Sequence, residues 1–145
     1  SSLWDAVLGN KKFRQEEMVH REEALQLLTL FGLDKAQNEL AKNLCYGDQR
    51  KLEIVRALAT KPRLLLLDEP AAGMNATEKH LLIELIRRIH VQYRLAILLI
   101  EHDMDVVMAL CPRILVLDYG EIIAEGPPEE IRKNPKVIEA YLGKS

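Results

Sequence analysis

Apolar residues recur every three or four positions along the first third of the chain, which is the spacing of one helix face. From residue 16 to residue 31 this spacing predicts an amphipathic helix that ends at Gly32, after which Asp34 begins a second short helix. Residues 3–8 form a short apolar turn or helix before it, and the basic stretch 11–14 is predicted to be a solvated connection. The apolar positions of the longer helix are Ala24, Leu25, Leu28 and Phe31.

From Asp48 onward, helical patterns alternate with short apolar runs. The run 63–67, which is apolar after Arg63, and the wholly apolar run 95–100 predict strands that are buried on both faces. Further strands at 113–117 and 121–124 flank Asp118-Tyr119-Gly120, a sequence typical of a hairpin turn. Thr77 is the predicted N-cap of the helix after the first apolar run. The predicted helices are 49–60, 77–92, 103–110, 127–133 and 135–142, the 77–92 stripe being Leu81, Leu82, Leu85, Ile86 and Ile89.

This alternation favours an α/β fold with a parallel core, beside which the leading helices form a small subdomain. The 145 residues are 48% hydrophobic with a formal net charge of −2, so the chain suits one domain or part of one and is not a disordered chain. Acids match bases almost one for one, which disfavours a nucleic-acid binder driven by bulk charge. The apolar runs are too short to span a bilayer, and no secretory leader is visible. Cys45 and Cys111 have no zinc-ligand spacing and imply no disulfide framework, which fits a reducing compartment.

Two adjacent carboxylates, Asp68 and Glu69, follow the first apolar strand, at the edge where open α/β sheets bind ligands. An aspartate there can hold Mg²⁺, and a neighbouring glutamate can orient and deprotonate a water. A solvated acidic turn explains such a pair equally well when it stands alone.

Two further features point to phosphate chemistry, although each has an ordinary structural explanation. Gly47 opens an amphipathic helix, where backbone N–H groups can approach an anion, but a simple capped helix start has the same appearance. His102 follows the second apolar strand and can hydrogen-bond a phosphate or a catalytic water, but a lone histidine there is more often structural.

The order of these features resembles the ATP-binding cassette (ABC) family of ATPases over essentially the whole chain. The segments Tyr-Gly-Asp-Gln-Arg (46–50), Glu-Pro-Ala-Ala-Gly-Met-Asn (69–75) and Leu-Leu-Ile-Glu-His-Asp-Met (98–104), with the tail 126–143, are similar to branched-chain amino-acid importers and in particular to the larger of their two ATP-binding subunits. The family motifs are matched by 44–49 (signature motif), 64–69 (Walker B strand), 71–75 (D-loop) and His102 (switch histidine).

The resemblance implies the C-terminal part of a P-loop NTPase (RecA-like) ABC core with an incomplete central sheet. Residues 1–43 would belong to the helical subdomain, 44–125 to the ATPase core and 126–145 to a C-terminal extension. Asp68 would coordinate Mg²⁺, Glu69 would act as general base, and His102 would contact the γ-phosphate of ATP, while Asn75 would touch the dimer seam. The residues that would face a nucleotide held by the opposite subunit are Cys45, Tyr46, Gly47, Asp48 and Gln49.

The implied protein hydrolyses ATP to energise amino-acid import. Its implied partners are a second, non-identical ABC ATPase subunit in a head-to-tail dimer and transmembrane permease subunits, with no nucleic acid. Its implied location is the cytoplasmic face of the cell membrane. Two alternatives stay open: a truncated, non-catalytic fragment that contributes only a signature face, and an ABC ATPase that serves a process other than transport.

Several family features are missing from the sequence. No G-x-x-x-x-G-K-[ST] phosphate loop is present, since position 138, where its first glycine would precede Gly143-Lys144-Ser145, is Ile138, and the glutamine loop is absent too. We therefore expect Ser1 to lie inside a longer chain, and the isolated chain to be inactive and poorly folded because a central strand is lacking. Cys45 stands where the signature motif usually has Ser.

Overall fold

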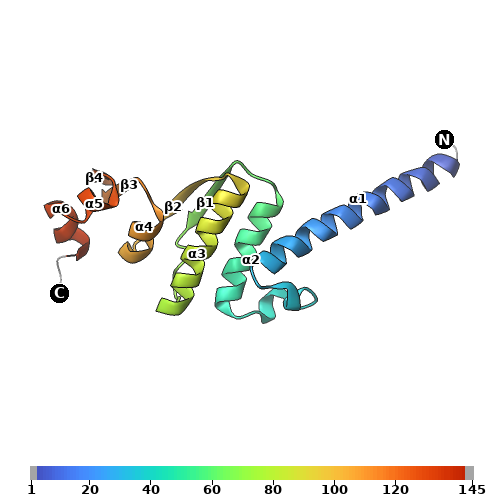
Figure 1. Ribbon diagram of the computed structural model, residues 1–145, viewed down its shortest axis with the longest axis horizontal. Coiled ribbons are helices and arrows are strands. Elements are labelled where there is room, and N and C mark those ends of the chain that lie inside the picture. Colours follow the sequence, from blue (N-terminus) through green and yellow to red (C-terminus); the bar gives the residue numbers. More distant parts are fainter. Residues whose placement is uncertain (1–2, 143–145) are drawn as a thin grey trace. The chain divides into compact units, whose positions relative to one another are not determined.

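The structure is a computed structural model that describes the backbone of residues 3–142 and the side chains of residues 13–141 (Figure 1). The chain divides into two compact units, Ser1–Leu65 and Leu66–Ser145, and each is described by itself. The terminal Gly143-Lys144-Ser145 lies outside the described residues. The first unit contains α1 (Leu3–Leu30), the 3₁₀ turns η1 (Asp34–Ala36) and η2 (Ala41–Asn43), and α2 (Tyr46–Ala59). After β1 (Leu64–Asp68), the second unit contains α3 (Ala76–Tyr93), β2 (Ala96–Ile100), α4 (Met104–Leu110), β3 (Ile114–Asp118), β4 (Glu121–Gly126), α5 (Pro128–Ile131), α6 (Pro135–Val137) and the π-helical turn η3 (Ile138–Leu142).

Helix α1 runs without a break, so the solvated connection predicted at 11–14 is wrong. The residues of that stretch are all compatible with a helix interior, and the apolar segment before it belongs to the same helix. The buried face agrees with the predicted one in part: Phe31 is buried and Leu25 and Leu28 are half-buried. Leu27 is buried instead of Ala24, which is exposed, because the larger side chain supplies more apolar area against α2. Gly32 ends the helix with φ of 70°, as predicted.

Strands β1 and β2 lie side by side in a two-stranded sheet, but neither strand is buried on both faces. In β1, Leu67 is buried and Leu66 is 65% exposed. In β2, Leu98 and Ile100 are 57% and 58% exposed. The prediction of double burial is wrong because no element within residues 3–142 covers the second face of this sheet.

Strands β3 and β4 form a second, antiparallel sheet whose register pairs Asp118 with Glu121. The turn between them has positive φ at both central residues, 46° at Tyr119 and 84° at Gly120, which is the pattern of a type I′ hairpin turn. The predicted hairpin is therefore confirmed. The central sheet is incomplete, as the resemblance implies, because β2 and β3 belong to separate sheets in the described chain.

The second unit has a small core that is built by α4, β3 and the C-terminal turns. Ile131 and Val137 are 1% and 0% exposed, so the tail packs firmly against the hairpin. The two C-terminal helices begin at prolines as predicted, but the first ends at Ile131 and the second continues as a π-helical turn. The buried members of this core are Val107, Ile114, Val116, Ile131 and Val137.

Helix α3 begins at Ala76 behind a complete capping box. The Asn75 side chain accepts a hydrogen bond from the Glu78 N–H at 3.0 Å, and the Glu78 carboxylate accepts one from the Asn75 N–H at 2.9 Å. The predicted N-cap at Thr77 is wrong, because Asn75 and Glu78 stand at the two positions that a capping box requires. Most of the predicted stripe is buried or half-buried, but Leu81 is exposed and Ile83 is buried instead.

Removing the cap side chain has a measurable cost in stability. We expect Asn75→Ala to lower the free energy of unfolding of the full-length protein, with any sequence that precedes Ser1, by about 1 kcal/mol, because the Glu78 N–H loses its partner. Chemical denaturation measures the difference. The matched control is Thr77→Ala at an exposed position two residues on; an equal loss in both variants would contradict the observed cap.

Candidate functional site

The carboxylate pair lies at the end of β1, where the chain leaves the sheet. Asp68 is the last residue of the strand, and Glu69 follows with φ of 45°, a left-handed conformation. The Glu69 N–H donates a hydrogen bond to the Ile100 carbonyl oxygen at 2.8 Å, which ties this turn to the end of β2. Both carboxylates are exposed, so they are accessible to a ligand.

His102 follows β2 and contacts the carboxylate of Glu69. The distance between His102 Nδ1 and Glu69 Oε1 is 3.1 Å, and the two side chains are 68% and 50% exposed. A contact this exposed adds little to stability. Its importance is geometric: it brings the predicted base and the predicted histidine together, directly after Asp68.

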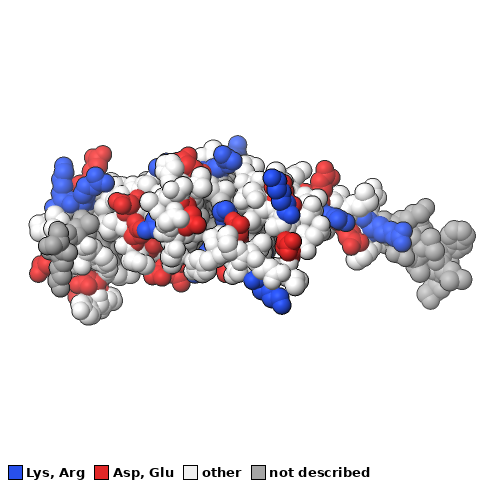
Figure 2. Space-filling view, turned by 90° about the horizontal axis from the view of Figure 1, so that it is seen from below, with Lys and Arg blue, Asp and Glu red and all other residues white. Residues whose placement is uncertain are grey.

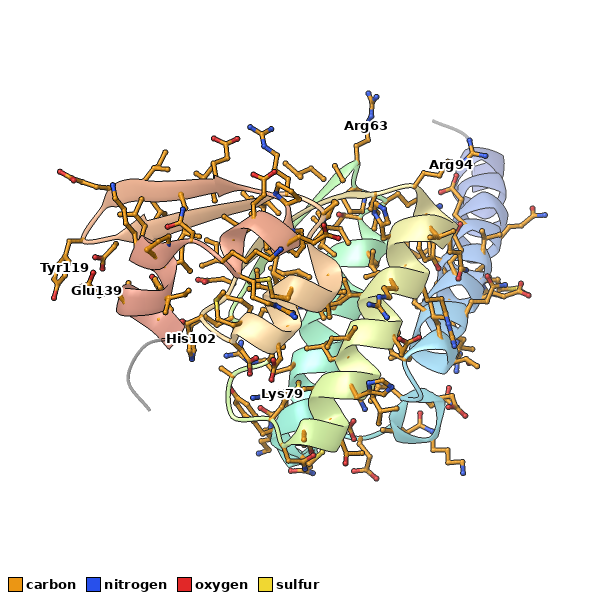
Figure 3. All side chains as sticks on the ribbon, turned by 60° about the vertical axis from the view of Figure 1, so that its left-hand side comes forward. Arg63, Lys79, Arg94, His102, Tyr119 and Glu139 are labelled. Carbon is orange, nitrogen blue, oxygen red and sulfur yellow. The ribbon has the colours of Figure 1, made fainter. Side chains whose placement is uncertain are left out.

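The residues on either side of His102 each contact a residue that follows Glu69 in the sequence. Glu101 contacts Ala71 in the turn, and Asp103 contacts Lys79 on α3. Glu101 Oε1 accepts a hydrogen bond from the Ala71 N–H at 2.8 Å. Asp103 caps α4 and forms an ion pair with Lys79 of α3. Lys79 and His102, the residue before Asp103, are both labelled in Figure 3. The Lys79 ammonium lowers the pKa of Asp103, and hydrogen bonding to Asp103 raises the pKa of Lys79.

These flanking contacts are not apparent from the sequence. Glu101 is 30 residues from Ala71, and Asp103 is 24 residues from Lys79. No periodic pattern marks pairs at such separations. The one indication in the sequence is that Glu101 and Asp103 stand directly beside the candidate histidine, His102.

The glycine-bearing segment lies in the first unit and forms the start of α2. Helix α2 begins at Tyr46 behind Cys45, earlier than predicted, and places Gly47 in its first turn. Gln49 Nε2 donates a hydrogen bond to the Leu44 carbonyl oxygen at 2.9 Å, which fixes the entry of the chain into the helix.

Charged side chains on α2 engage one another along its exposed face. Asp48 pairs with Lys51 at 2.7 Å, and this ammonium lowers the pKa of the Asp48 carboxyl. The guanidinium of Arg50 lies over the Tyr46 ring, 5.3 Å from its centroid, and also pairs with Glu53 at 2.9 Å. Tyr46 and Arg50 are therefore held together on the first turns of the helix.

The carboxylates after β1 suit Mg²⁺ in one specific way. Within residues 13–141, no group of three His, Cys, Asp or Glu side chains is arranged to enclose a metal ion. Mg²⁺ does not need such a cage, because it is commonly held by one or two carboxylates together with substrate phosphates and water. Asp68 fits this mode.

Two family models match the sequence of this chain. Residues 4–72 match the model of the ABC transporter family, and residues 121–145 match that of the branched-chain amino acid ATP-binding cassette transporter. The high-affinity branched-chain amino acid transport ATP-binding protein LivG of Salmonella typhimurium is 46% identical over 145 residues. The chain belongs to the ATP-binding cassette family. Among further relatives of this cassette chain, the corresponding protein BraF of Pseudomonas aeruginosa is 45% identical over 133 residues, which are 92% of the chain and 52% of BraF.

Solved cassette structures confirm the fold class. The ADP conformation of MJ1267, an ATP-binding cassette of an ABC transporter, superimposes with a TM-score of 0.77 at 32% identity, covering 86% of this chain and 50% of MJ1267. A nucleotide-free ATP-binding cassette from an ABC transporter gives a TM-score of 0.72 at 30% identity and covers 99% of this chain and 58% of its own. The cassette chain spans 57% of the length of LivG.

The surface of the cassette chain carries mixed charge. On the face seen in Figure 2, acidic and basic side chains are interspersed rather than gathered by sign. None of the described helices combines the length and apolar character that crossing a membrane requires.

Proposed function

We propose that this chain belongs to an ATP-hydrolysing subunit that energises import of branched-chain amino acids. The observation that carries the proposal is the contact between His102 and Glu69 directly after Asp68. Three groups suited to metal, water and phosphate are thereby present at the ends of two neighbouring strands. The names of LivG and BraF support the choice of cargo.

Each of these residues has a distinct role in the proposed reaction. Asp68 holds Mg²⁺, which neutralises charge on the ATP phosphates. Glu69 orients the attacking water and accepts its proton. His102 turns Nδ1 toward Glu69, so the other ring nitrogen is the one that contacts the γ-phosphate.

The segment that opens α2 acts on a second nucleotide in this proposal. Backbone N–H groups of the first turn attract an anion, and Gly47 permits close approach. This nucleotide is bound by the opposite subunit of a head-to-tail dimer. Asn75 touches the interface of that dimer, and the Asn75 side chain also caps α3. The proposed contacts to the nucleotide are Cys45, Tyr46, Gly47, Asp48 and Gln49.

The proposal also covers the partners of the chain, its location and its division into domains. The second ATPase subunit is a non-identical cassette, and the pair docks on permease subunits at the cytoplasmic face of the membrane. Residues 1–43 belong to the helical subdomain, 44–125 to the ATPase core and 126–145 to the C-terminal extension.

Transport by a reconstituted complex tests this proposal. We expect proteoliposomes that contain the full-length protein, its partner cassette and the permease to take up leucine only when ATP is supplied. Copurification with ribosomes or DNA instead of permease subunits would favour a cassette that serves another process. Absence of ATP binding by the full-length protein would favour a non-catalytic role.

Cys45 allows a smaller test of the signature segment. A thiol is a weaker hydrogen-bond donor than a hydroxyl, and the difference is on the order of 1 kcal/mol. We therefore expect Cys45→Ser to change the ATPase rate of the full-length protein by less than about tenfold, because backbone N–H groups supply the other contacts. Steady-state ATPase assays measure the change, and a hundredfold effect would show that the side chain is central.

A further inference from the structure

The turn after β1 holds Glu69 in a backbone conformation that side chains disfavour. Its φ of 45° is left-handed, and such a conformation persists where surrounding contacts fix it. Two backbone hydrogen bonds do so directly. The Glu69 N–H donates to the Ile100 carbonyl oxygen at 2.8 Å, and the Glu69 carbonyl oxygen accepts from the Ala72 N–H at 3.1 Å.

A third contact on this turn comes from the side chain of Glu101. Its Oε1 accepts a hydrogen bond from the N–H of Ala71, a residue that is 2% exposed. A buried N–H needs an acceptor, and the turn offers this one through a side chain on another loop. Glu101 thus connects the turn that carries Glu69 to the loop that carries His102.

The second carboxylate oxygen of Glu101 shows that this connection costs free energy of folding. Oε2 is buried and has no hydrogen-bond partner within the described part of the chain. Burying a carboxylate oxygen without a partner is unfavourable, and each such group in a folded protein calls for an explanation. Stability alone does not supply one here.

We propose that Glu101 is a positioning residue that fixes the Glu69 turn against the loop bearing His102, so that base and histidine keep their separation during ATP hydrolysis. The inference rests on the proposed ATPase function. Glu101 acts through the Ala71 N–H and does not contact ATP. The ion pair between Lys79 and Asp103 holds the other side of the same loop to α3.

Substitution of Glu101 in the full-length protein tests this role. We expect Glu101→Ala to lower kcat by about tenfold to a hundredfold, because small misplacements of a catalytic group have effects of that size. The KM for ATP stays within about twofold, since binding groups are untouched. Glu101→Gln keeps an acceptor for the Ala71 N–H and retains kcat within about threefold. Glu121→Ala, at an exposed glutamate of β4, is the matched control and changes neither parameter.

Hydrogen–deuterium exchange supplies a readout that is independent of turnover. We expect the Ala71 amide to be protected in the wild-type protein and in Glu101→Gln, and to exchange faster in Glu101→Ala. An unchanged kcat in Glu101→Ala, or equal losses in the alanine and glutamine variants, overturns the proposal. If Glu101→Ala does not fold, the other two measurements decide: rapid exchange of Ala71 in the wild-type protein, or a large loss of kcat in Glu101→Gln, overturns it.

The same assays separate this inference from the proposed function. Activity that is indifferent to Glu69→Gln refutes the proposed hydrolytic role and the inference with it. Activity that requires Glu69 but is unaffected by Glu101→Ala refutes the inference alone.

Discussion

Neutralising Glu69 by Glu69→Gln is expected to lower kcat for ATP hydrolysis by the full-length protein by about 10²–10⁴-fold, the usual contribution of a general base. The amide keeps the size of the side chain and still presents a polar group to His102 Nδ1, but it cannot take a proton from water at neutral pH. Nucleotide affinity is expected to stay within about threefold, because the loss concerns the transition state. Steady-state ATPase assays and equilibrium binding of ATP measure the two quantities.

Two matched variants show whether the effect belongs to Glu69 itself. Glu84→Gln changes an exposed glutamate of α3 that pairs only with Arg87 in the described structure, and it is expected to leave kcat unchanged. His102→Ala removes the partner of Glu69 and is expected to lower kcat while Glu69 is still present. Full turnover by Glu69→Gln would contradict the role assigned to Asp68, Glu69 and His102 together.

The isolated chain of 145 residues is expected to aggregate or to unfold without a cooperative transition. The sheet of β1 and β2 exposes Leu66, Leu98 and Ile100 on one face, and a two-stranded sheet also has unpaired strand edges. Exposed apolar strands pair readily with other chains. Size-exclusion chromatography and thermal unfolding measure the behaviour.

A designed variant separates the apolar face from other causes of aggregation. Replacing Leu66 and Leu98 with Lys or Thr is expected to increase the monomeric fraction, whereas the same change at exposed Val91 of α3 is expected to have a smaller effect. A wild-type chain that purifies as a monodisperse monomer with a sharp unfolding transition would contradict this prediction.

Local sequence rules predicted the elements whose determinants lie close together in the chain. The hairpin at Asp118-Tyr119-Gly120 was predicted from a turn sequence that favours positive φ. The helix predicted at 103–110 is observed as α4, with Asp103 as its N-cap. The fold class also followed, because the order of strands and helices is preserved even though the sheet is divided.

The error in strand burial arose because tertiary contacts decide which face of a sheet is covered. The apolar residues of the runs 63–67 and 95–100 indicated double burial, but burial depends on what covers a sheet, which a strand's own residues do not determine. The N-cap error had a local cause: Asn75 and Thr77 are both suitable cap residues, but only Asn75 has Glu78 three residues on, the spacing of a capping box. Glycine is the residue that usually indicates a left-handed backbone, and position 69 is a glutamate, so the sequence does not predict the positive φ observed there.

For the candidate site, the sequence indicated Asp68, Glu69 and His102 from their placement after strands. The contact of His102 with Glu69 is consistent with that placement, because β1 and β2 are neighbours. Glu101 was missed because its partner is a backbone N–H, which is present at nearly every position and leaves no trace in the sequence.

The left-handed geometry at position 69 determines which replacements there can be interpreted. A branched residue such as Val would add steric strain to the turn, and glycine would relax it, so either exchange alters the loop together with the chemistry. Glutamine has an unbranched Cβ and nearly the same volume as glutamate, so the backbone strain at this position stays the same. Among simple substitutions at this position, it is therefore the one whose kinetics report on proton transfer rather than on a rearranged backbone.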